Sequence, residues 1–234
     1  MRLIPETENL VRLTRFGMFN CFLIREQNEF TLVDTNFPGS HNSIARAAQS
    51  LGLPITRIAL THAHFDHIGS LDLLVPLMPH AEISIGAREA RLLRGDFSLE
   101  PGESGKPLLG FKSVRAPAHR LLNDGDLVGS LRVVTSPGHT PGHIAFLDTR
   151  DDSLLAGDSF ITQKGIIAAG VYSFFFPMPA WFSWNPALCA VSAAKLAALK
   201  PSRLAVGHGH TVSSPVPQMD RAVQLAFQQH PAGA

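Results

Sequence analysis

Three histidines and one aspartate fall within residues 61–67, in the order His-x-His-x-Asp-His. Imidazole and carboxylate groups are the ligands that divalent metals of intermediate softness prefer. Alternate side chains of an extended segment point the same way, so His62 and His64 can face one metal while a turn aims Asp66 and His67 at a neighbouring point. The segment predicts sites for two metals. An accidental histidine-rich turn is less favoured, because four potential ligands rarely coincide at this spacing.

Further candidate ligands follow strand-like runs later in the chain. His139 lies in a loop of sequence Ser-Pro-Gly-His-Thr-Pro-Gly-His, whose glycines and prolines favour a tight turn that holds one imidazole still. His143, the last residue of that loop, is expected to support the fold or a ligand. Asp158 follows the next strand, where it is either a turn residue or a bridge between two cations. His208 completes the set, and His210 beside it is the weaker candidate.

The elements that must position the first motif alternate between strands and helices. Strand-like apolar runs occupy residues 10–16, 19–25, 30–35, 58–60 and 82–85. Apolar residues at helical spacing occupy residues 44–51, 71–78 and 87–93. The histidine motif therefore sits on a strand-to-helix turn, which is where open α/β sheets keep their chemistry.

The second half of the chain repeats the order of strands followed by helices. Strand-like runs occupy residues 131–135, 144–148, 153–156 and 203–206, and helical patterns occupy 186–200 and 219–227. Two segments are predicted to be loops, a surface loop at 95–112 and an apolar loop at 160–184. With no repeat and no convincing linker, we expect a single domain over residues 1–234. The pattern predicts an α/β fold in which two sheets pack together with helices outside.

Composition excludes several classes of protein. The net charge of +1 and the 17% of charged residues leave no basic field for nucleic acid, and 45% hydrophobic residues support a buried core. Cys21 and Cys189 lie far apart in apolar segments, so buried free thiols in a reducing compartment are expected. The N-terminus lacks the apolar core of a secretion signal, and no stretch approaches a membrane span. We therefore expect a cytoplasmic protein with no membrane or nucleic-acid partner.

The four motifs in this order resemble those of the metallo-β-lactamase fold superfamily of metallohydrolases. They are H-x-H-x-D-H, P-G-H-T-P-G-H, G-D and G-H, and they extend over residues 61–210. The resemblance implies a four-layer αβ/βα sandwich, with two mixed β-sheets packed face to face and helices outside. It also implies a two-metal site along one edge of the paired sheets.

The resemblance further implies how the ligands divide. One metal would be held by His62, His64 and His139, and the other by Asp66, His67 and His208. Asp158 would bridge the two metals. Family members often carry an acidic residue at the end of an early strand, which would make Asp34 a hydrogen-bond partner of a ligand histidine. A plain turn carboxylate is an equally good interpretation of Asp34, since a backbone carbonyl can also support an imidazole.

Two adjacent cations predict hydrolysis. They lower the pKa of bound water toward roughly 7, which supplies a metal-bridging hydroxide near neutral pH, and they polarise a carbonyl or phosphoryl oxygen. Two Zn²⁺ ions are expected, with Fe or Mn as alternatives. The leaving group needs a proton, for which the candidates are Asp66, metal-bound water or a nearby hydroxyl.

The branch of the superfamily is indicated by what the motifs include and lack. True β-lactamases of this fold lack the bridging aspartate, so Asp158 favours the glyoxalase-II-like, lactonase-like and phosphoesterase-like branches. Glyoxalase II typically has a longer basic C-terminal part, whereas only a short tail follows His210. Lactonases usually have a tyrosine three residues after the bridging aspartate, where this chain has Ile161. The extended basic arm of tRNA-processing nucleases is absent from the sequence.

The apolar segment 160–184 is the clue to the substrate. It would form a wall near Asp158 suited to an acyl chain or an aromatic group, although core filling or a homodimer interface explains it equally well. The candidate substrate contacts are Tyr172, Phe174, Phe175, Phe176, Trp181 and Trp184. We expect a hydrophobic small-molecule ester or lactone as substrate.

Two other classes of function compete with the dinuclear zinc hydrolase. Relatives on this fold use iron to oxidise thiols or persulfides, and others cleave phosphodiesters. The ligand set without a flavin domain favours zinc. A binding protein with a lapsed metal site is less favoured, because such a site would have lost at least one of the seven ligands.

Overall fold

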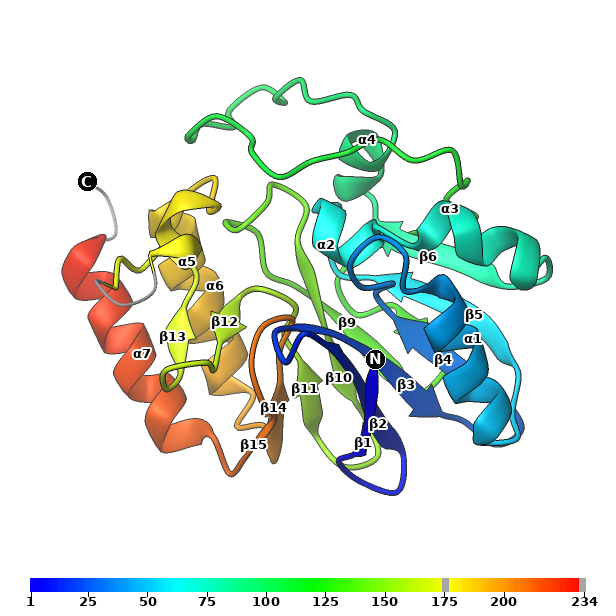
Figure 1. Cartoon of the computed structure of the whole chain (residues 1–234). Helices are drawn as coiled ribbons and strands as arrows, with labels where there is room; N and C mark the ends of the chain where they lie inside the picture. The colour runs from blue at the N-terminus through cyan, green and yellow to red at the C-terminus, as the bar shows by residue number, and fades with distance from the viewer. Residues whose placement is uncertain (174–176, 232–234) are drawn as a thin grey trace.

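Two β-sheets form the centre of the fold, and helices cover the outer face of each (Figure 1). The computed structural model describes residues 1–173 and 177–231. The succession of helices, sheet, sheet and helices confirms the predicted α/β sandwich. Among the described residues, no helix has the length and apolar character that crossing a membrane requires.

The first sheet keeps its strands in chain order. They are β1 (Arg2–Pro5), β2 (Leu10–Arg15), β3 (Phe19–Arg25), β4 (Phe30–Val33), β5 (Ile55–Leu60), β6 (Glu82–Gly86) and β7 (Arg120–Leu122). The pairs from β1 to β4 are antiparallel, and the pairs from β4 to β7 are parallel. Parallel strands end at the same edge of a sheet, so the loops that follow β4, β5 and β6 come together.

The second sheet has the order β15-β14-β11-β10-β9-β8. Its strands are β8 (Leu127–Val128), β9 (Leu131–Thr135), β10 (Ile144–Asp148), β11 (Ser153–Leu155), β14 (Arg203–Ala205) and β15 (Val212–Ser213). Strand β10 runs antiparallel to β9 and β11, and β11 runs parallel to β14. The loops after β9, β11 and β14 therefore meet at one edge, and these are the loops with His139, Asp158 and His208.

Helices pack on the outside of both sheets. The first sheet carries α1 (His41–Ser50), α2 (Phe65–Ile68), α3 (Leu71–Leu74) and α4 (Glu89–Leu93), and the second carries α5 (Met178–Trp181), α6 (Pro186–Ala198) and α7 (Val216–Gln229). Asn185 caps α6 as an N-cap residue should, since its side chain accepts a hydrogen bond from the Leu188 N–H at 2.9 Å. The helix predicted over 71–78 is shorter, because Pro76 lies in a 3₁₀ turn that follows α3.

Three apolar clusters hold the layers together. One lies between the sheets, where Phe22 and Phe146 are almost fully buried. A second packs α1 and α3 on the first sheet around Ile44 and Leu71, and a third packs α6 and α7 on the second sheet around Met219. The burial of apolar surface on both faces of each sheet fixes the orientation of the strand ends that carry the candidate ligands.

Of the two segments predicted as loops, the one at 95–112 is a loop, and the apolar one at 160–184 is more structured than the sequence indicated. The apolar segment contains the hairpin β12 (Phe160–Ile161) and β13 (Ile167–Ala168) together with α5. The segment between α4 and β7 crosses above the strand ends as an extended chain (Figure 1). It contacts both halves of the molecule: its Lys106 N–H donates to the Trp184 carbonyl at 2.7 Å, and its Gly110 carbonyl accepts from the Phe65 N–H at 2.9 Å.

Candidate metal centre

The histidine loop leaves β5 and turns directly into α2. His64 is extended (φ −68°, ψ 145°), so its side chain and that of His62 lie on the same side, with ring centroids 4.7 Å apart. Asp66 and His67 lie in the single turn of α2, which begins directly after His64. One short segment thus presents its side chains at two neighbouring points, because the chain changes from extended to helical within it.

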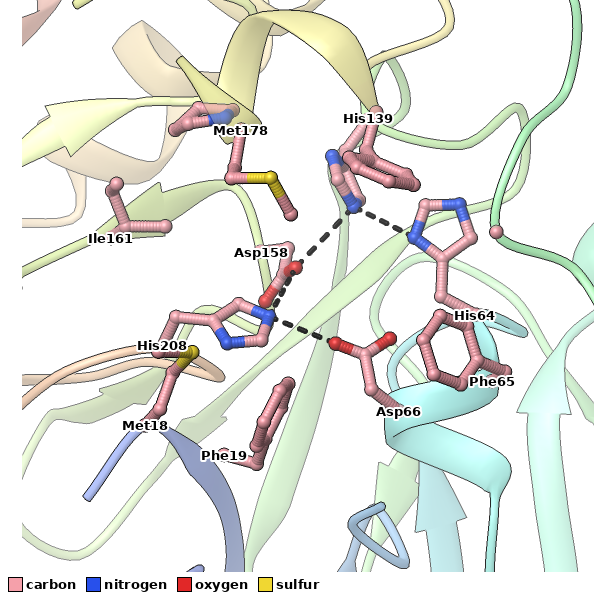
Figure 2. Close-up of a pocket in the computed structure, with 13 residues that line it drawn as sticks. Met18, Phe19, His64, Phe65, Asp66, His139, Asp158, Ile161, Met178 and His208 are labelled. Carbon is pink, nitrogen blue, oxygen red and sulfur yellow. Dashed lines mark hydrogen bonds and ion pairs between the residues drawn. The ribbon is translucent and has the colours of Figure 1, made fainter. Parts of the chain in front are cut away.

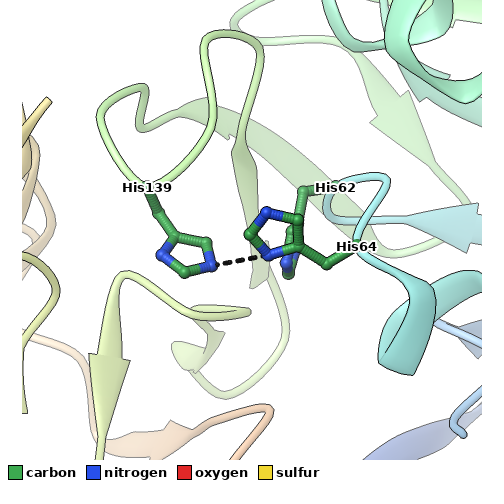
Figure 3. A group of neighbouring side chains, drawn as sticks. All are labelled: His62, His64 and His139. Carbon is green, nitrogen blue, oxygen red and sulfur yellow. Dashed lines mark hydrogen bonds between the residues drawn. The ribbon is translucent and has the colours of Figure 1, made fainter. Parts of the chain in front are cut away.

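Three imidazoles converge at the first point (Figure 3). One nitrogen atom from each of His62, His64 and His139 lies within 4.8 Å of the others, and His64 Nδ1 is 3.0 Å from His139 Nε2. Tetrahedral zinc with bonds of about 2.0–2.1 Å would hold two nitrogens roughly 3.3 Å apart. The buried His62 Nε2 finds no hydrogen-bond partner among the described residues, which an ion at this point would supply.

The second point is lined by both carboxylates and imidazoles (Figure 2). His208 Nε2 lies 3.2 Å from Asp66 Oδ2 and 3.1 Å from Asp158 Oδ2. The other oxygen of Asp158 lies 3.2 Å from His67 Nε2, and its Oδ2 lies 3.4 Å from His139 Nε2. Asp158 therefore contacts imidazoles of both sets, which is the position that a bridging carboxylate needs.

The two sets differ in charge state. Burial lowers the pKa of His64 to about 4 and that of His139 to about 3, and it lowers the pKa of His62 as well. Burial alone would also lower the pKa of His208, but Asp158 and Asp66 outweigh it and raise the pKa to about 10. Burial would lower the pKa of His67 too, but the carboxylates of Asp158 and Asp34 outweigh burial and raise that pKa. The three-histidine set is neutral at pH 7, whereas His67 and His208 carry protons in the metal-free protein.

Metal binding should therefore displace imidazole protons at one set only. At pH 7 a divalent ion entering the second set must displace about two protons, from His67 and His208, and an ion entering the three-histidine set displaces none. Affinity at the second set should consequently rise with pH until it passes the raised pKa values. Calorimetric titration of Zn²⁺ in two buffers of different ionisation enthalpy measures the release, and equal release at both steps would contradict this assignment.

Asp34 supports the second set through its contact with His67. Its Oδ2 lies 2.8 Å from His67 Nδ1, and its two oxygens accept hydrogen bonds from the N–H and hydroxyl of Thr61, each at 2.8 Å. The residue is buried and has a left-handed backbone (φ 60°), a conformation that aspartate tolerates better than most residues. Asp34 is thus a hydrogen-bond partner of a candidate ligand, as the resemblance implied, rather than a plain turn residue.

Two of the remaining nitrogens of the first set contact hydroxyl groups, whereas His64 Nε2 is buried with no hydrogen-bond partner among the described residues. His62 Nδ1 lies 3.0 Å from Thr61 Oγ1, and His139 Nδ1 lies 3.2 Å from Ser183 Oγ, which itself donates to the Pro179 carbonyl at 2.6 Å. Such contacts fix the ring orientation and leave the opposite nitrogen free to bind. Sequence reasoning missed Ser183, because nothing in its local sequence marks it as a partner of a histidine far along the chain.

His143 and His210, the two further histidines in the motif loops, have different roles. His143 is buried, and its Nε2 accepts a hydrogen bond from the Asp158 N–H at 3.1 Å while its Nδ1 faces Ser136 Oγ at 2.9 Å. It therefore holds the backbone of the Gly-Asp turn. His210 is exposed, and only its carbonyl takes part locally, as the acceptor of a hydrogen bond from the Thr162 hydroxyl at 2.6 Å.

A cavity of about 140 Å³ opens onto the carboxylate and imidazole cluster (Figure 2). Its polar lining is His64, Asp66, His139, Asp158 and His208, and its remaining lining is Met18, Phe19, Phe65, Gly110, Ile161, Met178, Pro179 and Phe182. Among the described residues, no lysine or arginine lines it. The cavity walls are thus mainly apolar, and the ionisable side chains that line the cavity are all candidate metal ligands, which form its floor.

Three of the six residues expected to contact substrate do not line the cavity. Tyr172 is 54% exposed, Trp181 is 58% exposed and Trp184 is buried beside Gly105, and none of the three lines the cavity. The other three candidates, Phe174, Phe175 and Phe176, lie outside the described residues. The segment contributes Met178 and Phe182 instead, because one helical turn places residues four apart on the same face.

Known proteins resemble this chain over most of its length. Residues 14–208 match the family described as the metallo-beta-lactamase superfamily. The protein YobT of Bacillus subtilis is 46% identical over 228 residues, which cover 95% of this chain and 98% of YobT. A hydroxyacylglutathione hydrolase of Aeromonas hydrophila is 30% identical over 200 residues, which cover 82% of this chain and 62% of that enzyme.

The fold agrees with these matches. The crystal structure of TTHA1623 in a di-iron-bound form has a TM-score of 0.66 and 24% sequence identity, and the match covers 88% of this chain and 95% of that one. At this identity the likeness shows a shared fold. The family match covers more than half of the chain and includes every motif from the histidine loop to His208. This chain therefore belongs to the metallo-beta-lactamase superfamily.

Proposed function

We propose that the protein is a dinuclear zinc hydrolase that cleaves a neutral ester or lactone with an apolar acyl or aryl part. The observation that carries the proposal is the apolar cavity placed directly over a cluster of imidazoles and carboxylates. The similarity to a hydroxyacylglutathione hydrolase supports hydrolysis as the reaction class.

The donor set suits two divalent ions. His62, His64 and His139 would hold one ion through neutral nitrogens, and Asp158 would be shared with the other. The second ion would be completed by the mixed set of Asp66, His67 and His208. When bound, two zinc ions would supply an activated water near neutral pH and polarise the carbonyl of the substrate. Nitrogen and carboxylate oxygen without thiolate match the preference of zinc in catalytic sites.

The chain's own residues supply positioning and exclusion of water. Phe19, Phe65 and Phe182 line the cavity walls, and an acyl or aryl group against them would hold the scissile carbonyl at the floor. Burial would raise the pKa of Asp66, but His208 outweighs it and lowers the pKa to about 2. His208 would lose its proton to a bound ion, so this low pKa belongs to the metal-free protein. Asp66 and water at the open mouth of the cavity are both candidates for protonating the leaving group.

The lining also selects against charged substrates. A glutathione thioester carries carboxylates far from the bond that is cleaved, and proteins recognise such groups with arginine or lysine. Within the described part of the chain the cavity presents neither. A neutral ester or lactone needs no such partner, so the apolar lining favours it over a glutathione thioester.

A panel of aryl esters, lactones, thioesters, phosphodiesters and β-lactams tests the proposal with zinc-loaded protein. We expect kcat/KM for the best neutral ester or lactone to exceed that for hydroxyacylglutathione and for phosphodiesters by at least about 100-fold, which corresponds to about 2.7 kcal/mol of selectivity. A phosphodiester or β-lactam as the best substrate would refute it.

Phe182 and Trp181 form a matched pair for the role of the apolar wall. Phe182 lines the cavity and its ring centroid lies 6.5 Å from that of His64, whereas the neighbouring Trp181 is exposed outside the cavity. Phe182→Ala should raise KM for aryl and long acyl substrates about tenfold, because part of the apolar contact is lost, and change kcat little. Trp181→Ala should change KM less than about twofold. Steady-state kinetics would contradict this account if the two variants behaved alike.

A second candidate function is iron-dependent oxidation of a thiol or persulfide. The observation in its favour is the di-iron form described for the structural neighbour TTHA1623. Imidazole and carboxylate ligands also accept iron. Purified protein that holds iron tightly and consumes oxygen with a thiol or persulfide, while leaving esters intact, would favour this function over hydrolysis.

A further inference from the structure

Glu89 is a fully buried acid near the centre that the ligand set does not include. It is the first residue of α4, which follows β6 at the same sheet edge as the histidine loop. Charged residues are rarely buried completely unless their oxygens are satisfied by hydrogen bonds or ions. Its surroundings therefore indicate what its carboxylate does.

All three hydrogen bonds that Glu89 accepts come from the loops that carry the three-histidine set. Its Oε1 accepts from the Ala63 N–H at 2.9 Å, and Ala63 stands between His62 and His64. Its Oε2 accepts from the Thr140 hydroxyl and from the Gly142 N–H, each at 2.9 Å, and Thr140 follows His139. One carboxylate thus joins a loop of the first sheet to a loop of the second.

The contact between these loops is close. A side chain at Gly142 would meet the backbone of Glu89, with its Cβ only 2.8 Å from Glu89 Cα. Thr140 is fully buried with Glu89, so the joint is shielded from solvent. The contacts of the Glu89 carboxylate with both loops therefore determine how far His139 lies from His62 and His64.

The negative charge of Glu89 has no ion-pair partner among the described side chains. The neighbouring Arg88 is directed elsewhere, with its Nε 2.7 Å from Glu103 Oε1. Burial raises the pKa of Glu89 to about 7, although the three hydrogen bonds oppose that shift. A buried carboxylate is stabilised by nearby positive charge, which a divalent ion at the three-histidine set would supply.

We propose that Glu89 is a positioning residue that sets the geometry of the three-histidine set. The role rests on the proposed metal-dependent function. Glu89 belongs to no candidate ligand set and does not line the cavity. It acts through Ala63, which stands between His62 and His64, and through Thr140 and Gly142, which lie in the loop of His139.

The test is metal affinity, measured by competition with a chromophoric chelator for Zn²⁺ and Co²⁺. Glu89→Gln keeps the shape but places an amide NH₂ where two oxygens accepted three hydrogen bonds, so at least one N–H of the loops loses its acceptor. Affinity of the three-histidine set should fall about 10- to 100-fold, and that of the second set should change less than about threefold. His139→Ala and His208→Ala identify which binding step belongs to which set.

Asp148→Asn is the matched control. Asp148 is also buried and accepts three hydrogen bonds, all from Arg150, at the opposite end of β10 from the His139 loop. It should lower thermal stability without changing either metal affinity. The milder Thr140→Val removes one donor and should weaken the three-histidine set alone, by about threefold.

Three results would overturn the role of Glu89. They are unchanged affinity of the three-histidine set in Glu89→Gln, an equal loss at both sets, and an equal loss in Asp148→Asn. Each would show that the carboxylate supports only the fold. A wild-type protein that binds no metal at either set would refute the proposed function as well, so the two failures are distinguishable.

Discussion

Replacing Asp158 with alanine is expected to lower kcat/KM for the best ester or lactone at least about 1,000-fold and to remove one equivalent of bound zinc. Asp158 is the carboxylate that contacts imidazoles of both sets, at 3.1 Å from His208, 3.2 Å from His67 and 3.4 Å from His139. Its loss would remove the carboxylate shared by the two proposed ion positions, on which the activation of water would depend. Metal analysis by mass spectrometry and steady-state kinetics measure the two effects.

The Asp158→Ala protein should remain folded, because the carboxylate lies in the cluster and not in an apolar core. Circular dichroism and the melting temperature check this point. Asp220→Ala, which removes an exposed carboxylate on α7, is the control and should retain metal and turnover. Full turnover of Asp158→Ala with two zinc ions bound would show that the chemistry lies elsewhere.

Adding a single methyl group at Gly207 should be nearly as damaging. Gly207 follows β14, and a Cβ there would lie against Asp158 Oδ1 and 2.5 Å from His67 Cε1. The backbone at Gly207 has no positive φ, so alanine fits its conformation and the conflict is with the two candidate ligands alone. We expect Gly207→Ala to lower kcat/KM at least about 100-fold and to weaken zinc binding at the second set.

Gly102→Ala is the control, because it introduces backbone strain without a steric conflict with the candidate ligands. Gly102 has a φ of 88° and nothing within 4 Å of an added Cβ. Alanine there should cost about 1 kcal/mol of stability and leave metal binding unchanged. The account of Gly207 would be wrong if its alanine variant lost stability to the same extent and kept its zinc.

The ligand loops could be predicted from sequence because their chemistry is explicit in residue type. His62, His64 and His139 follow apolar strand-like runs, and the order of strands in each half brings those strand ends to one edge. The long strands and helices were predictable for the same reason, since their apolar residues recur at regular spacing. Short edge strands were not: β8 and β15 have two residues each, too few to show any alternation.

The walls of the cavity were less predictable. Trp181 and Phe182 are adjacent aromatic residues, and which of them faces the cavity depends on the phase of a four-residue helix that sequence does not reveal. Met18 and Phe19 come from the β2–β3 hairpin, far from the aromatic segment in sequence. Glu89 was missed because an acid at the start of a helix usually needs no other explanation.

The two-metal centre can be tested by zinc titration of metal-free protein, with activity measured after each addition. We expect two equivalents bound in wild-type protein, ester or lactone hydrolysis that saturates only with the second, and loss of the second step in His208→Ala. Hydrolysis that saturates at one equivalent, or a second step that survives in His208→Ala, would contradict a two-metal centre built from these side chains.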